Sequence, residues 1–266
     1  MLAKPILLIG AGALGSAMLK GMRAAGHVAP SDLIILDLNP GEEAQVYAGL
    51  GARLNPAPEV WREAFTVIIA VKPQSWRGAA QILDGNLNKG ATLISVMAGV
   101  RTEDLSTVFA PLKVARVIPT TGVATGKGVA SLYSADGVAL QAASDLFSPM
   151  AATVVLENED LIDAATAASG SGPAYVYAFV QSLEKAALET GLTPADAKTL
   201  ARATVISAAH LLDATEADPE DLIRKVASPG GTTEAALKVL RQSGSGLDEL
   251  VTAAVLAAQK RSKELG

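Results

Sequence analysis

The chain has 266 residues, of which 50% are hydrophobic and 4% aromatic, and a net charge of −5 at pH 7. That length suits one large domain or two ordinary ones, and the acidic balance argues against nucleic acid or an anionic membrane as the main partner. The absence of cysteine excludes thiol catalysis, disulfides and thiolate metal sites. With only two histidines, His27 and His210, we expect no metal site.

The N-terminal residues enter a strand pattern directly. They show no cleavage-site pattern and no apolar run long enough to cross a bilayer. We therefore expect no signal peptide or transmembrane helix, and a cytoplasmic protein.

A glycine-rich turn follows the first predicted strand. Residues 5–9 are continuously apolar, as in a strand buried on both faces, and run into Gly10-Ala11-Gly12-Ala13-Leu14-Gly15. A helix pattern over residues 16–25 comes next. A second apolar run, residues 33–36, stops at Asp37. A strand before the turn, a helix after it and an acidic residue about 20 positions later are the contexts that confirm a dinucleotide fingerprint.

The chemistry of this turn assigns a role to each glycine. Gly10 makes the tight turn, Gly12 lets the backbone approach a pyrophosphate, and Gly15 lets the helix pack closely on the strand. Ala13 and Leu14 stand in the same cofactor-binding turn. At the end of the second strand, Asp37 would accept hydrogen bonds from a ribose diol and repel a 2′-phosphate.

The alternation of strands and helices continues to about residue 157. Further strands are expected over residues 66–71, 92–97, 113–118, 128–133 and 153–156, with helices over 42–50, 60–64 and 137–147. This pattern predicts an α/β fold, with a Rossmann-type, doubly wound and mainly parallel sheet. The strand at 66–71 ends in Ala70-Val71-Lys72-Pro73, and ligands sit at the carboxyl ends of parallel strands. We therefore place Lys72 beside the cofactor; a solvated lysine is the alternative.

The remaining chain reads as helical. Helix patterns cover residues 161–168, 174–190, 194–214, 220–227, 234–242 and 247–264. The last of these is apolar around most of its girth, so it must be buried on more than one side. We predict a dinucleotide-binding domain over residues 1–157 and an all-α domain over 158–266 that a second subunit completes.

The turn Ser228-Pro229-Gly230-Gly231-Thr232-Thr233 lies between two of these helices. Proline and two glycines force the chain to turn, and Thr232 or Thr233 can cap the next helix. Backbone N–H groups and three hydroxyls then form a cradle suited to a carboxylate or a phosphate. The alternative is an ordinary capped turn between helices.

Four stretches together resemble the pyrroline-5-carboxylate reductase family. They are the glycine-rich turn of residues 10–15, Ala70-Val71-Lys72-Pro73-Gln74, Ser169-Gly170-Ser171-Gly172-Pro173-Ala174-Tyr175 and Ser228 to Thr233. The likeness covers essentially the whole chain in order. It implies reduction of 1-pyrroline-5-carboxylate to L-proline by hydride transfer from NADPH or NADH. It also implies an α-helical dimerisation domain, and so a homodimer or a higher assembly of dimers.

The resemblance also assigns roles to the turn at residues 228–233. It places the substrate carboxylate on Ser228 and on the N–H groups of Gly231, Thr232 and Thr233, with Gly230 in the same turn, and the ring nitrogen on Thr233. The resemblance makes Thr233 the candidate catalytic residue. No histidine or cysteine is expected to act as acid or base, and a hydroxyl is a poor acid, so the proton is expected on the substrate or through water.

Two departures from the family pattern leave alternatives open. Ile118-Pro119-Thr120-Thr121-Gly122 replaces the usual Met-Pro-Asn-Thr-Pro, and we expect Gly122 to loosen the turn; Ala227 stands where Ser or Thr is common. A reductase of a related cyclic imine and a non-catalytic NAD(P)-binding sensor therefore remain alternatives. A 3-hydroxyacid dehydrogenase is disfavoured, because Pro173-Ala174-Tyr175-Val176 lacks the lysine that those families carry there.

Overall fold

The computed structural model describes residues 2–265. They divide into two compact units: the first ends at Gly170 and resumes at Ala258, and the second is Ser171–Ala257.

The first unit is built on an eight-stranded sheet in the order β3-β2-β1-β4-β5-β6-β7-β8. The strands are β1 (Ile6–Ile9), β2 (Leu33–Leu36), β3 (Arg53–Leu54), β4 (Thr66–Ile69), β5 (Thr92–Ser95), β6 (Lys113–Pro119), β7 (Gly128–Tyr133) and β8 (Ala151–Val155). The chain reverses its winding direction between β1 and β4, and such a switch point leaves a crevice at the carboxyl ends of the strands.

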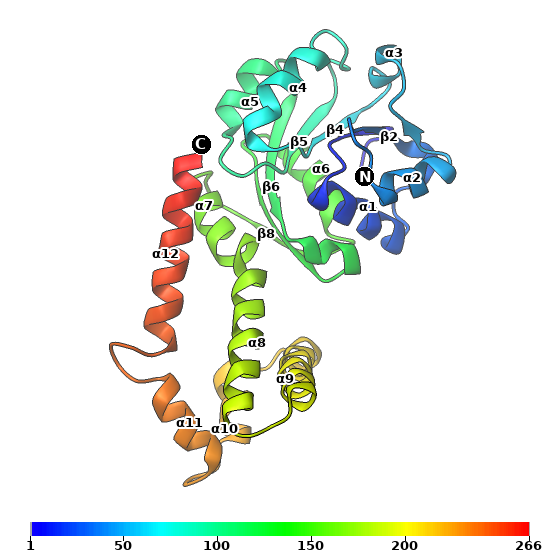
Figure 1. Ribbon diagram of the computed structural model, residues 1–266. Coiled ribbons are helices and arrows are strands. Elements are labelled where there is room, and N and C mark those ends of the chain that lie inside the picture. Colours follow the sequence, from blue (N-terminus) through cyan, green and yellow to red (C-terminus); the bar gives the residue numbers. More distant parts are fainter. Residues whose placement is uncertain (1, 266) are drawn as a thin grey trace. The chain divides into compact units, whose positions relative to one another are not determined.

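Helices cover both faces of this sheet, as Figure 1 shows. The helices are α1 (Ala13–Ala25), α2 (Glu42–Gly49), α3 (Pro58–Trp61), α4 (Trp76–Leu83), α5 (Thr102–Val108), α6 (Gly137–Phe147) and α7 (Leu161–Ala165). One core packs α1, α2 and α6 on the sheet, and a second packs α4 and α5 on the opposite face. Alternating strand residues serve the two cores: Leu8 lies in the first and Leu7 in the second. The predicted doubly wound α/β fold is confirmed.

One pair of strands is antiparallel. β7 runs against β6, with Pro119 opposite Ala130, whereas the pairs from β3 to β6 and the pair β7–β8 are parallel. Only residues 120–127 connect β6 to β7. A parallel crossover needs a dozen or more residues, so this short connection reverses the strand direction.

The second unit consists of helices. They are α8 (Gly172–Glu189), α9 (Pro194–Thr215), α10 (Pro219–Val226), α11 (Thr232–Leu240) and the part of α12 (Leu247–Leu265) up to residue 257. Local chemistry sets their starts: Thr193 accepts from the Asp196 N–H at α9, and Asp218 accepts from the Glu220 N–H at α10. All six helical segments expected from the sequence after residue 160 are present.

Apolar side chains of this second unit remain exposed. Ala197 and Ala201 are its only buried apolar residues in the described part of the chain. Leu250 is 64% exposed and Leu256 58%. A helical unit without a core of its own needs another surface to cover it. None of the described helices is both long and apolar enough to span a membrane.

Candidate active site

The glycine-rich turn lies at the carboxyl end of β1. Gly10 has a φ of +95°, and a Cβ there would lie 2.7 Å from the Ala70 carbonyl oxygen. At Gly15, a Cβ would lie 2.2 Å from the Gly10 carbonyl oxygen. Only glycine fits at either position: the positive φ and the close approach both exclude a side chain at Gly10, and the close approach excludes one at Gly15.

Gly12 has the opposite surroundings. A Cβ there would meet no heavy atom within 4 Å, so the space above this residue is open. Gly12 caps α1, whose first N–H groups, including those of Ala13 and Leu14, have no partner within the helix. Open space beside unpaired N–H groups at a helix N-terminus fits a pyrophosphate.

Asp37 lies next to this turn. Its Oδ2 accepts a hydrogen bond from the Ala11 N–H at 2.5 Å, and its Oδ1 accepts from the Asn39 N–H at 2.7 Å. Asn55 holds the Asp37 backbone from the other side, donating to its carbonyl and accepting from its N–H. Asn55 was not among the residues expected from the sequence. The Asn55-Pro56 dipeptide, which favours a turn, is the local signal there, and asparagine tolerates the φ of +48° that the residue adopts.

The segment Ala70–Pro73 meets the turn at the same sheet edge. The Ala70 N–H donates to the Ile9 carbonyl at 2.7 Å, and Gly10 donates to the Leu36 carbonyl at 2.8 Å. Val71 and Pro73 are half-buried, whereas Lys72 is exposed. These hydrogen bonds bring the predicted cofactor residues of the first unit together at the carboxyl ends of neighbouring strands.

The turn after β6 is closely packed. The Thr120 hydroxyl accepts a hydrogen bond from the Val129 N–H at 3.0 Å, and the Thr120 N–H donates to the Val129 carbonyl at 2.8 Å. A Cβ on Gly122 would lie 3.0 Å from the Lys127 carbonyl oxygen. The expectation that Gly122 loosens this turn is therefore wrong: Thr120 extends the pairing of β6 with β7, and Gly122 fits where a side chain would crowd the backbone.

The turn at residues 228–233 opens α11. The Gly231 N–H donates to the Ser228 carbonyl at 2.9 Å, and Gly230 has a φ of +71°. The N–H groups of Thr232 and Thr233 make no hydrogen bond within residues 2–265. Neither threonine caps the helix with its side chain, because the N-cap is Gly231. The predicted threonine cap is thus wrong, and both hydroxyls stay available to a ligand.

Glu234 is a further residue of this turn that the sequence analysis missed. Its Oε2 accepts from the Gly230 N–H at 2.5 Å, and Lys238 lies 3.3 Å from its Oε1. Glutamate at the third helical position is the signal that could have identified it, because a carboxylate there reaches back to the turn. At the ends of α10 and α11 that lie away from the turn, Arg241 forms an ion pair with Glu220, with 2.8 Å between Nη2 and Oε2. The two helices are therefore linked both by the turn and by this ion pair.

Comparison with known proteins extends this picture. The family model described as pyrroline-5-carboxylate reductase dimerisation matches residues 159–265, and the model of coenzyme F420-dependent NADP oxidoreductases matches residues 5–99. Pyrroline-5-carboxylate reductase of Pseudomonas aeruginosa is 34% identical, over 98% of this chain and 96% of its own.

Solved structures agree over nearly the full length. The pyrroline-5-carboxylate reductase of Coxiella burnetii matches with a TM-score of 0.86 and 28% identity, covering 99% of both chains. The Plasmodium falciparum pyrroline carboxylate reductase with NADP bound matches with a TM-score of 0.83 and 26% identity, covering 99% of this chain and 98% of its own.

Proposed function

This chain belongs to the pyrroline-5-carboxylate reductase family, and from that premise we propose that the turn at residues 228–233 holds its substrate. The enzyme reduces 1-pyrroline-5-carboxylate to proline and depends on NAD(P)H. Its tasks are therefore to bind a carboxylate, to orient a cyclic imine and to hold a dinucleotide.

The free N–H groups of Thr232 and Thr233 carry this proposal. They stand at the positive end of the α11 dipole, where a carboxylate is stabilised. The Gly231 N–H, which was expected to bind the carboxylate, already donates to the Ser228 carbonyl, and the Gly230 N–H donates to Glu234. The substrate carboxylate therefore takes the Thr232 and Thr233 N–H groups and the Ser228 hydroxyl, while Gly230 and Gly231 shape the turn.

Thr233 bonds the ring nitrogen with its hydroxyl. When bound, NAD(P)H supplies the hydride that the imine carbon accepts. The imine carbon is most electrophilic when its nitrogen is protonated, and a neutral hydroxyl is a poor acid, so the proton arrives on the substrate or through water. Thr233 then orients the ring and bonds the nitrogen as it becomes an amine.

The first unit holds the dinucleotide. The N–H groups around Gly12, Ala13 and Leu14 bind the pyrophosphate, and the Asp37 carboxylate accepts from the ribose diol. Residues 70–73 border the same site at the neighbouring strand end. We propose residues 1–157 as the cofactor domain and 158–266 as the dimerisation and substrate domain, which follows the dimerisation match over 159–265. Residues 158–170 and those from 258 onward belong to the first compact unit by their packing.

The assembly follows from the second unit. A helical unit with two buried alanines cannot be stable without a partner, and this region matches a dimerisation domain. We therefore propose a homodimer, or a higher assembly of dimers, that acts in the cytoplasm.

Steady-state kinetics test the substrate site. Ser228→Ala removes one charge-assisted hydrogen bond worth about 1.5–3 kcal/mol, so KM for pyrroline-5-carboxylate should rise about tenfold or more with kcat retained. Thr233→Ala should lower kcat, because its contact tightens in the transition state. The KM for NAD(P)H should stay unchanged in both, and Ser243→Ala, an exposed serine of the same unit, is the control. Wild-type kcat/KM in both variants would show that the turn is only a helix connection.

A further inference from the structure

Arg116 is a buried cation that the reaction does not use. It lies in the middle of β6 and is 2% exposed, with Nη1 donating to Glu159 Oε1 at 2.6 Å. Its Nε and Nη2 have no hydrogen-bond partner among residues 2–265. These two nitrogens form one edge of the guanidinium, the edge that binds a carboxylate with two parallel hydrogen bonds. A buried donor without an acceptor costs free energy of folding, so we expect an acceptor to bind this edge.

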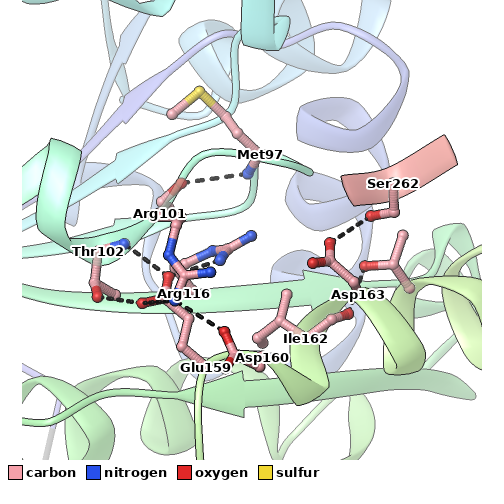
Figure 2. Close-up of polar contacts among 11 residues, drawn as sticks. Met97, Arg101, Thr102, Arg116, Glu159, Asp160, Ile162, Asp163 and Ser262 are labelled. Carbon is pink, nitrogen blue, oxygen red and sulfur yellow. Dashed lines mark hydrogen bonds and ion pairs between the residues drawn. The ribbon is translucent and has the colours of Figure 1, made fainter. Parts of the chain in front are cut away.

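The Arg116 side chain borders a cavity of about 310 Å³. The other lining residues are Gly99, Arg101, Asp160, Asp163, Ser262 and Lys263. Every one of them belongs to the first compact unit, and none belongs to the proposed cofactor or substrate residues. Figure 2 shows the two arginines beside Glu159 and Asp160, with Asp163 and Ser262 across from them. The cavity is thus separate from the residues that perform the reaction.

The carboxylates around this cavity already accept some hydrogen bonds from the protein. Glu159 accepts from Arg116 and from the Thr102 N–H and hydroxyl, at 2.7 and 2.6 Å. Asp160 pairs with Arg101 at 2.9 Å. Asp163 Oδ1 accepts from the Ser262 hydroxyl at 2.6 Å, whereas its Oδ2 receives no hydrogen bond from the described residues. Arg116, which carries an unpaired donor edge, and Asp163, which carries an unpaired carboxylate oxygen, therefore both line this cavity.

We propose that this cavity is a second, non-catalytic site for a small zwitterionic amino acid. Its carboxylate bonds the Nε and Nη2 edge of Arg116, and its ammonium group faces Asp163. The lining carries both signs of charge, with Arg101, Arg116 and Lys263 beside Asp160 and Asp163, and Asp160 is already paired with Arg101. A zwitterion therefore meets a partner for each of its charges, whereas a simple anion would leave Asp163 without one. The volume lies at the lower end of the range for ligand pockets, which favours a molecule of amino-acid size. Proline, the product of the enzyme, belongs to this chemical class.

Thermal unfolding of the full-length protein with glycine, acetate or inorganic phosphate tests the proposal. Glycine is the probe because proline also fits the substrate turn. We expect glycine to raise the Tm of the wild type in a saturable manner, and acetate and phosphate to raise it less. Asp163→Asn and Arg116→Lys should abolish the glycine shift. Arg23→Lys should retain the glycine shift, because Arg23 pairs with the buried Glu43 and neither residue lines the cavity.

A variant of the substrate turn keeps this test separate from the proposed function. Ser228→Ala should retain the full glycine shift; a shift lost in Ser228→Ala places glycine at the substrate turn and overturns the second site. If acetate raises the Tm of the wild type by as much as it raises that of Asp163→Asn, Asp163 does not face the ligand, and the amino-acid assignment is overturned. A crystal grown with glycine that shows only ordered water on the Arg116 edge overturns the proposal altogether. If Arg116→Lys does not fold, Asp163→Asn carries the test.

Discussion

The Glu234 carboxylate accepts a hydrogen bond from the Gly230 N–H, with 2.5 Å between Oε2 and N. Gly230 has a positive φ, so this bond holds the turn in a conformation that only glycine adopts readily. Lys238 lies one helical turn beyond and pairs with the other carboxylate oxygen. Glu234 therefore fixes the turn whose next two N–H groups we assign to the substrate carboxylate.

Glu234→Ala should loosen this turn and raise KM for pyrroline-5-carboxylate. A lost capping interaction costs about 1 kcal/mol, which corresponds to about a fivefold change. Glu234→Gln keeps an acceptor oxygen and should stay close to the wild type, and the KM for NAD(P)H should not change in either variant. Equal effects of alanine and glutamine would show that the charge of Glu234, and not its hydrogen bond, is what matters.

Gly12 and Gly15 offer a matched pair of substitutions in the cofactor turn. Gly12→Val should fold normally, because a Cβ there meets no atom within 4 Å, yet its side chain should block the approach of the pyrophosphate. Gly15→Ala should instead destabilise the fold, because its Cβ would lie 2.2 Å from the Gly10 carbonyl oxygen. Circular dichroism and NAD(P)H fluorescence titration separate the two effects. Unchanged cofactor affinity in a folded Gly12→Val protein would contradict the pyrophosphate assignment.

The sequence predicted the strands that carry the cofactor turn, because buried parallel strands are continuously apolar and end at glycine or at charged residues. It missed α4 and α5. α4 (Trp76–Leu83) follows a proline and contains Gly78, and α5 (Thr102–Val108) has seven residues with three that are β-branched, so neither has a strong helical signal. β3 has two residues and exists only through its pairing with β2.

Contacts between distant residues could not be predicted from the sequence. Arg116 and Glu159 are separated by 43 positions, and their pairing depends on how the segment between β8 and α7 lies against β6. The turn at residues 228–233 could be predicted, because proline and glycine act locally there, although the expected threonine cap is absent. Which of its N–H groups remain free depends on Glu234 and on the Gly231–Ser228 bond, and both follow from the folded geometry.

Leu256 on α12 tests the homodimer. It is 58% exposed in the single chain, and we expect a second subunit to cover it. Leu256→Asp would then bury an unpaired carboxylate and should yield aggregated or dissociated protein. Leu50→Asp is the control, because Leu50 is 55% exposed and lies at the end of α2 in the first unit. A stable wild-type monomer in analytical ultracentrifugation would refute the proposed assembly.

Acid should weaken the fold through Glu159. Burial alone would raise the pKa of this carboxyl, but hydrogen bonds from Thr102 and Arg116 outweigh it and hold the pKa below its ordinary value. The stabilisation is present above the unfolded pKa of about 4.3 and is lost as the pH falls through the lower folded value.

Glu159→Gln should therefore be less stable at pH 7, by about 3–5 kcal/mol, because it leaves Arg116 without its charged partner. As the pH is lowered below about 5, the free energy of unfolding of Glu159→Gln should also decrease less than that of the wild type, because the titrating group is gone. Urea unfolding of both proteins across this range measures the difference. Parallel pH profiles would show that Glu159 titrates alike in the folded and unfolded states.

Asp37 should set the choice of cofactor. Its carboxylate lies beside the glycine-rich turn, bonded to the Ala11 and Asn39 N–H groups, where it would repel a 2′-phosphate. Arg53, a cation that could have offset this charge, is paired with Glu63. We expect NADH to be at least competitive with NADPH. Asp37→Ser and Asp37→Asn should both shift the kcat/KM ratio toward NADPH, and asparagine should do so with less loss of activity because it keeps an acceptor for the turn. A wild-type enzyme that strongly prefers NADPH would show that Asp37 does not face the ribose.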